Sequence, residues 1–251
     1  MIRIATAGWS VPRAVVDAFP AQGGGLERYA ARFDAVEINT TFYRSHRPST
    51  YARWAAATPA RFRFAVKLPR TITHHARLLA ADPLLAAFRA EALELGDKLG
   101  PLLVQLPPSL AFAAPVADQF FGTLRDLWPE AIVCEPRHIS WFETEADALL
   151  CSHRIGRVAA DPACCPAAAT PGGWRGLAYW RLHGSPRMYF SAYDDEALCA
   201  LASRIAAVGA PGTWCVFDNT ALGFAAANAL RLRAILSAGA RGQPNRAACA
   251  M

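Results

Sequence analysis

Ionisable and polar residues recur along this chain at one kind of position, the carboxyl end of a short apolar segment. The segment 177–184 contains Arg181 and His183 and is closed by Gly184. Side chains alternate between the two faces of a strand, so Arg181 and His183 share a face. A buried arginine or histidine costs free energy unless it has a partner. The segment therefore indicates a site for proton transfer or for an anionic ligand.

The same pattern recurs in seven of eight such segments. Their terminal polar residues are Asn39, Lys67, Gln105, Glu135, Asp161, His183 and Asp218. Neighbours of opposite charge shift each other's pKa values, which allows a site to hold an acid and a base at one pH. His183 is the first candidate for a general acid or base, because histidine titrates near neutrality. The predicted catalytic residues are His183, Glu135, Lys67, Asp161 and Asp218.

Lys67 has two possible roles: a clamp for a negative charge or, if it is desolvated, an amine nucleophile. Basic loops follow several of the segments, and the planar guanidinium of arginine suits phosphate or carboxylate. We therefore expect an anionic small-molecule substrate, although solvated loops would look the same. The predicted substrate-binding residues are Arg181, Arg137, His138, Glu37, Asn39, Tyr43, His74, Gln105, Arg187 and Asn219.

Strands are predicted at residues 2–8, 35–39, 62–68, 102–106, 131–135, 157–161, 177–184 and 213–218. Helices are predicted at 26–33, 51–57, 82–98, 115–127, 144–152, 194–208 and 225–238, with caps from Asp82 and from Thr144 with Asp147. This alternation predicts the α/β class and a single (β/α)8 TIM-type barrel over residues 1–240. A doubly wound sheet is the competing fold, but no glycine-rich phosphate fingerprint follows the first strand.

In such a barrel, active sites form where the carboxyl ends of the strands meet. The alternative is that the terminal residues only pair with one another and plug the barrel. The Pro-, Ala- and Gly-rich stretch 162–176 predicts an irregular connection between the sixth and seventh strands, and residues 241–251 are predicted to be a disordered tail. Arg187 and Asn219 follow the seventh and eighth strands, where many barrels hold phosphate.

Composition is that of an ordinary globular protein, with 251 residues of which 53% are hydrophobic and 18% charged. The net charge of +6 favours anionic partners without implying nucleic acid. Seven cysteines, with no CxxC pair, favour reduced thiols. No apolar run approaches the ~20 residues of a membrane span or the pattern of a signal peptide. We therefore expect a cytoplasmic protein without a membrane partner.

Several ordered motifs resemble the YecE-like family, known as domain of unknown function 72. The motifs are Gly8-Trp9-Ser10, residues 33–43, Phe64-Ala65-Val66-Lys67 with Thr73-His74, Gln105-Leu106-Pro107-Pro108, Glu135 with Arg137-His138 and Trp141, residues 181–184 and residues 217–220. The resemblance implies a TIM-type barrel but brings no established reaction and no assigned catalytic residues. Pro136 departs from the family pattern, in which a large apolar residue is expected, and it removes a backbone donor beside Arg137.

Three functions fit these observations. The favoured one is an enzyme, a hydrolase or lyase, that uses acid/base chemistry on an anionic substrate without a cofactor. The second is a hydrolase of nucleic acid that binds a divalent metal through Glu37, Glu135, His183 and Asp218. Lys67 and Arg181 argue against it because they would repel the metal. The third is a non-catalytic module that binds single-stranded nucleic acid, which would not need the acidic strand ends.

Overall fold

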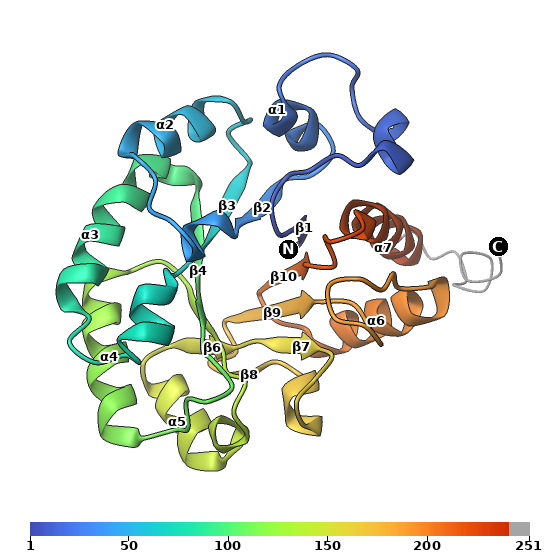
Figure 1. The fold of residues 1–251 in the computed structure, drawn as a ribbon. Coiled ribbons are helices and arrows are strands. Elements are labelled where there is room, and N and C mark those ends of the chain that lie inside the picture. Colours follow the sequence, from blue (N-terminus) through green and yellow to red (C-terminus); the bar gives the residue numbers. More distant parts are fainter. Residues whose placement is uncertain (241–251) are drawn as a thin grey trace.

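The strands of this protein lie in two sheets, as the computed structural model, which describes residues 1–240, shows (Figure 1). One sheet has the order β1 (Ile2–Thr6), β10 (Gly212–Phe217), β9 (Leu177–Leu182) and β7 (Ala159–Asp161). The other has the order β2 (Ala35–Ile38), β3 (Arg63–Lys67), β4 (Leu99–Gln105), β5 (Ile132–Glu135), β6 (Ile155–Arg157) and β8 (Gly172–Gly173). The α/β class is confirmed, but the prediction of a single eight-stranded barrel is wrong.

The division between the sheets occurs inside the predicted sixth strand, 157–161. Its first part belongs to β6, which pairs with β5, whereas its second part is β7, which pairs with β9. The two-residue strand β8 returns antiparallel along β6, with Gly173 opposite Gly156. Gly173 has a φ of 60°, and a Cβ there would lie 2.6 Å from the carbonyl oxygen of Ile155. Only glycine allows this close approach, so β8 occupies the edge of β6 that a closed barrel would use.

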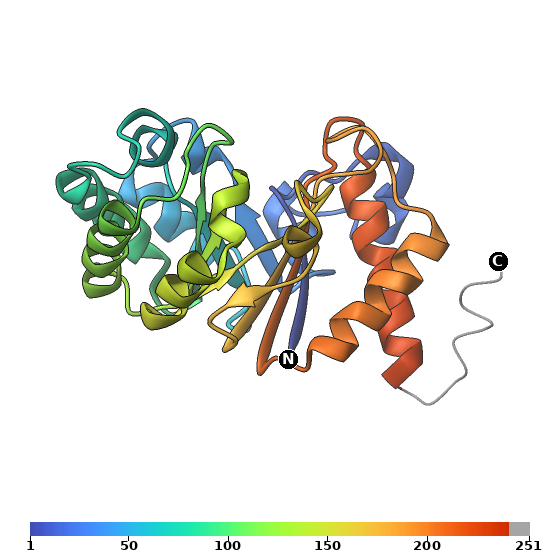
Figure 2. The same cartoon turned by 90° about the horizontal axis from the view of Figure 1, so that it is seen from below.

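Seven α-helices of the described chain flank the sheets. They are α1 (Gly25–Ala30), α2 (Pro48–Ala56), α3 (Asp82–Ala92), α4 (Ala114–Leu127), α5 (Thr144–Ser152), α6 (Asp195–Val208) and α7 (Phe224–Ala240). Helices α2 to α5 lie on the side of the six-stranded sheet, while α6 and α7 lie beside the four-stranded sheet (Figure 2). The strands therefore lie between two groups of helices.

Helix boundaries differ from the prediction where local chemistry intervenes. The predicted helix 82–98 ends at Ala92, and the following turns, Leu93–Lys98, contain Gly96 in a non-helical conformation. Neither Asp82 nor Thr144 caps its helix through the side chain. Asp147 instead accepts hydrogen bonds from Arg157 Nε at 2.8 Å and from the backbone N–H of Gly173 at 3.0 Å. That carboxylate thus fixes β8 against β6 rather than capping α5.

Between residues 162 and 176 the described chain forms no α-helix, as predicted, but a 3-10 turn at Pro166–Ala169 and then β8. The predicted tail, 241–251, lies outside the described residues. Cys134, Cys151, Cys164, Cys165 and Cys215 carry free thiols; Cys199 is not among them. Of the helices within residues 1–240, none combines the length and the apolarity that crossing a membrane demands.

An apolar layer supports the carboxyl ends of the strands. It joins residues of both sheets: Ala5, Ala35, Ala65, Leu103, Val133, Val158, Leu177, Tyr179, Trp214 and Val216. Because side chains two positions apart in a strand share a face, the next residues on that face form a second layer. These are Glu37, Lys67, Gln105, Glu135, Arg181 and Asp218, all buried. The fold therefore places a buried layer of charged and polar side chains directly above an apolar layer.

Candidate functional site

Arg181 lies at the centre of a buried charge network that joins three carboxylates from three strands. Its Nη1 donates to Glu135 Oε2 at 2.6 Å, and its Nη2 donates to Glu37 Oε1 at 2.7 Å and to Asp218 Oδ2 at 3.0 Å. Arg181 and Glu37 are 0% exposed. Charges buried this deeply are stable only while their partners remain in place. Residues far apart in the chain are thus held together at one point.

Tyr179 completes the hydrogen bonding of Glu37. Its hydroxyl donates to Glu37 Oε2 at 2.9 Å, and Arg181 Nε donates to the same oxygen at 3.1 Å. Burial and the charge of Glu37 raise the pKa of Tyr179 well above its usual range, so the hydroxyl keeps its proton. Tyr179 was not among the predicted site residues. The available signal was its spacing, because it lies two residues before Arg181 on the same strand face.

His183 lies between two carboxylates. Its Nδ1 is 3.0 Å from Asp218 Oδ2 and its Nε2 is 2.9 Å from Glu135 Oε1. A neutral imidazole carries one N–H, whereas two carboxylate acceptors require two, so the geometry favours the imidazolium. Burial lowers the pKa of His183, but the charge of Glu135 and the hydrogen bonds with Asp218 and Glu135 outweigh it and raise the pKa. The His183 ring therefore favours the doubly protonated, positively charged form, which has a proton that it can donate.

The carboxylates of Glu135 and Asp218 remain ionised because the cations around them lower their pKa values. Burial raises the pKa of Glu135, but Arg181, His183 and Arg137 hold it well below the usual range. Burial likewise raises the pKa of Asp218, and Arg181 and His183 reverse that shift. Glu135 Oε1 also accepts from Arg137 Nη2 at 3.1 Å, so His183 and Arg137 share one acceptor.

Lys67 is also buried in this layer, but unlike Arg181 it makes no hydrogen bond from its side-chain Nζ to any described residue. Its Nζ lies 4.1 Å from the centroid of the Phe42 ring. Burial and the charge of Arg181 lower the pKa of Lys67 to about 8, although Glu37, Glu135 and Asp218 act in the opposite direction. A lysine amine that releases its proton near neutral pH can act as a base.

A cavity of about 330 Å3 adjoins the network. Glu135, Arg137 and His183 line one part of it, and the other lining side chains include Cys164 and Met188. This volume is within the range of small-molecule sites. Arg137 is the cation with most access to it, since its side chain is 21% exposed.

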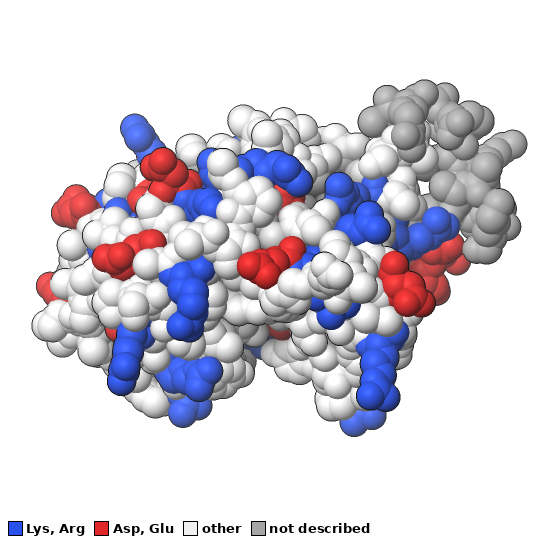
Figure 3. Space-filling model, turned by 90° about the horizontal axis from the view of Figure 1, so that it is seen from above, with Lys and Arg blue, Asp and Glu red and all other residues white. Residues whose placement is uncertain are grey.

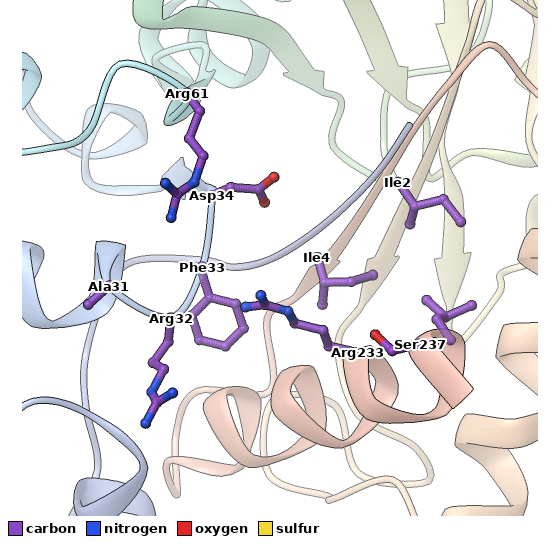
Figure 4. A pocket seen from close by; sticks show the side chains of 10 residues that line it. Ile2, Ile4, Ala31, Arg32, Phe33, Asp34, Arg61, Arg233 and Ser237 are labelled. Carbon is purple, nitrogen blue, oxygen red and sulfur yellow. The ribbon is translucent and has the colours of Figure 1, made fainter. Parts of the chain in front are cut away.

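A second cavity, of about 370 Å3, lies at the opposite ends of the strands (Figure 4). Its lining includes Ile2 at the start of β1, Asp34 just before β2, and Arg233 of α7. It holds no member of the buried charge network. The chemistry therefore points to the carboxyl ends of the strands.

Other predicted residues are near the network without joining it. The backbone carbonyl of Asp161 accepts from the His183 N–H, but within the described residues the side chain of Asp161 makes no hydrogen bond to a member of the network. Gln105 is buried opposite Glu135 in the sheet register. His74 bonds to Thr73, and Lys67 and Arg137 contribute to the lowering of its pKa, which burial dominates.

The remaining predicted substrate-binding residues lie elsewhere. Tyr43 and Arg187 are exposed, and the Arg187 guanidinium stacks on Phe190. The side-chain amide of Asn219 donates to Ser191 O and Asn228 Oδ1, which ties it to a neighbouring loop. The two other residues are His138, which bonds to Ser140, and Asn39, whose buried Oδ1 has no described partner.

The predicted metal ligands Glu37, Glu135, His183 and Asp218 do come together, but as partners of Arg181 and of one another. A divalent ion there would have to displace the guanidinium, which would cost the network its central cation. No group of three or more His, Cys, Asp or Glu side chains within residues 1–240 is arranged to hold a metal ion. The donor set therefore fits buried ion pairs better than metal ligation.

The nucleic-acid alternative requires a continuous basic surface. On the face in Figure 3, Lys and Arg side chains are interrupted by Asp, Glu and uncharged residues. Nucleic-acid binding stays a prediction.

Comparison with known proteins identifies the family. The model described as "Protein of unknown function DUF72" matches residues 3–249. The chain belongs to the DUF72 family. Its resemblance to this family in the sequence motifs is thereby confirmed.

Two curated proteins of related sequence are "UPF0759 protein YecE" of Escherichia coli K12 and "UPF0759 protein YunF" of Bacillus subtilis 168. The first is 37% identical over 107 residues, which are 43% of this chain and 38% of YecE. The second is 27% identical over 114 residues, 43% of this chain and 40% of YunF. The aligned part of this DUF72 chain thus spans less than half the length of each relative.

Solved DUF72 structures share the fold over most of the chain. A DUF72 protein of Thermotoga maritima MSB8 is 26% identical with a TM-score of 0.78, covering 94% of this chain and 99% of that one. A DUF72 protein of Enterococcus faecalis V583 is 20% identical with a TM-score of 0.79, covering 94% and 96%. The overall fold of this chain is accordingly shared with these solved DUF72 proteins.

Proposed function

We propose that this DUF72 protein is an enzyme, a hydrolase or lyase, that acts on an anionic small molecule by acid/base chemistry. The reaction takes place at the carboxyl ends of the strands, beside the network around Arg181. The observation that carries the proposal is the position of His183 between the carboxylates of Glu135 and Asp218, at the wall of a cavity. Those carboxylates hold a proton on a group that would otherwise titrate near neutrality.

His183 serves as the general acid in this proposal. It gives a proton to the substrate and regains it afterwards, while Glu135 and Asp218 fix the ring and stabilise its charge. Lys67 serves as the base, because burial brings its pKa down to about 8. An acid whose pKa is raised and a base whose pKa is lowered can both be in their active forms near neutral pH.

Arg137 holds the anion. Its guanidinium is planar and permanently charged, and its Nη2 is anchored on Glu135. With His183 protonated, the four cations Lys67, Arg137, Arg181 and His183 face the three carboxylates Glu37, Glu135 and Asp218. One positive charge is then in excess, which attracts an anionic substrate; when Lys67 has lost its proton and can act as the base, three cations face three carboxylates and the charges balance.

The test is a turnover screen of anionic small molecules with the full chain, followed by His183→Asn on any substrate found. We expect the substitution to lower kcat by about 10²–10⁴-fold, the usual contribution of a general acid or base. His153→Asn is the matched control, because His153 pairs with Asp118 away from the cavity. A folded His183→Asn protein with unchanged kcat would remove His183 from the mechanism.

A further inference from the structure

The cavity beside the charge network combines a few charged side chains with apolar ones. Glu135, Arg137 and His183 supply the charged groups, whereas Val158, Ala160 and Met188 are among the apolar lining residues. Apolar walls favour the burial of apolar ligand surface and offer nothing to hydroxyl groups. The lining therefore favours a ligand whose polar atoms are gathered at one end and whose remaining surface is apolar.

Proline removes backbone donors from three places in this lining. Pro108, Pro136 and Pro162 all contribute to it, and a proline has no N–H. Phosphate sites in proteins usually collect several backbone N–H groups at a loop or at the start of a helix. Pro136 therefore counts against a phosphate ligand in this cavity. It departs from the family pattern in the sequence, and its position next to Arg137 gives that departure a chemical consequence.

Arg137 is the permanently charged guanidinium in the lining of this cavity. Its Nη2 donates to Glu135 Oε1 at 3.1 Å, and the Tyr189 side chain is a further neighbour that helps to raise the pKa of Arg137. A guanidinium has five N–H donors in a planar fork, enough to bind a carboxylate in addition to these partners. Arg181, by contrast, is fully buried and already bonded to Glu37, Glu135 and Asp218.

We infer that the substrate is a monocarboxylate with an apolar body, its carboxylate on Arg137 and its body against Val158, Ala160 and Met188. This inference rests on the proposed function, which leaves the nature of the anion open. We propose this carboxylate in place of a phosphate bound by Arg187 and Asn219. The Arg187 guanidinium stacks on Phe190, and the Asn219 amide donates to Ser191 O. Cys164 lies at the edge of the same cavity, so its thiol reports on occupancy.

The test measures binding and needs no turnover. Hexanoate and benzoate, their amides, and inorganic phosphate are titrated into the full chain by ligand-observed NMR at constant ionic strength. The carboxylates should bind, the amides should bind about tenfold or more weakly for want of the charged hydrogen bond, and phosphate should not displace the carboxylates. Carboxylate binding should also slow iodoacetamide alkylation of Cys164 but not of the exposed Cys151.

Two variants locate the ligand. Arg137→Gln should weaken carboxylate binding by about tenfold to a hundredfold, and Ala160→Leu should weaken it by filling the cavity without changing any charge. Arg233→Gln, in the cavity at the other end of the strands, is the control and should bind as the wild type does. Equal binding of carboxylates and amides, or competitive binding of phosphate, would overturn the inference. Carboxylate binding with these dependences, but without turnover, would uphold it and count only against the proposed function.

Discussion

Replacing Arg181 with methionine is expected to lower the free energy of unfolding by about 3–5 kcal/mol, the range for a buried ion pair that loses one partner. The substitution leaves Glu37, Glu135 and Asp218 buried without their shared cation. Urea denaturation of both proteins at pH 7 measures the difference. Arg187→Met is the control, because loss of its exposed contact with Phe190 should cost about 1 kcal/mol or less.

The stabilities of the wild type and of Arg181→Met should respond differently to a fall in pH. In the wild type the pKa values of Glu135 and Asp218 are lower in the folded than in the unfolded state. Their contribution to stability is therefore present above the unfolded pKa, about 4, and is lost as the pH falls through the folded values. In Arg181→Met the burial of these carboxylates favours protonation instead, so the difference between the proteins should shrink as the pH falls. A loss no larger than that of Arg187→Met would contradict the central place of Arg181.

Replacing Lys67 with methionine is expected to lower kcat by about 10²–10⁴-fold, the contribution of a positioned base, while raising stability at pH 7. The two effects have opposite signs because the folded protein disfavours the charged form of Lys67, whose pKa falls to about 8. Methionine keeps the length of the chain without that cost. Urea denaturation and turnover of the same preparation test both parts, and a structural lysine would show a loss of stability instead.

The pH dependence of the Lys67 effect follows from linkage. Between pH 8 and the ordinary lysine value of about 10.4, the unfolded chain binds a proton that folded Lys67 has released. The stability of the wild type relative to Lys67→Met should therefore rise with pH across this window. Turnover should rise as the pH approaches 8 and Lys67 loses its proton, and should fall once His183 is deprotonated. A relative stability that is flat between pH 7 and 10 would refute the lowered pKa.

The strand-end pattern predicted the charge network because two regularities determine it. Side chains alternate in a strand, and parallel strands bring their carboxyl ends to one edge. From the sequence alone, these rules predict that Glu37, Glu135, Arg181, His183 and Asp218 lie together. Nothing comparable governs loops, in which each side chain follows its own contacts. Arg187 and Asn219 were therefore assigned to a phosphate site although they bond to neighbouring loop residues.

The division into two sheets had no such signal. It depends on the pairing of Gly172 and Gly173 with β6, and a segment of two glycines has no hydrophobic period to predict a strand. The position of the Asp147 side chain also depends on tertiary contacts. Its carboxylate accepts hydrogen bonds from Arg157 and Gly173 instead of capping its own helix. Local secondary-structure propensity cannot predict contacts between residues that are separated in the sequence.

The proposed chemistry requires a doubly protonated His183 held between Glu135 and Asp218. Nitrogen-15 NMR of the histidine side chains at pH 7.5, assigned by comparison with His183→Asn, tests it directly. Two protonated ring nitrogens on His183, persisting above the ordinary histidine pKa of about 6.5, are expected. A His183 ring with a single N–H that titrates near 6.5 would contradict the account.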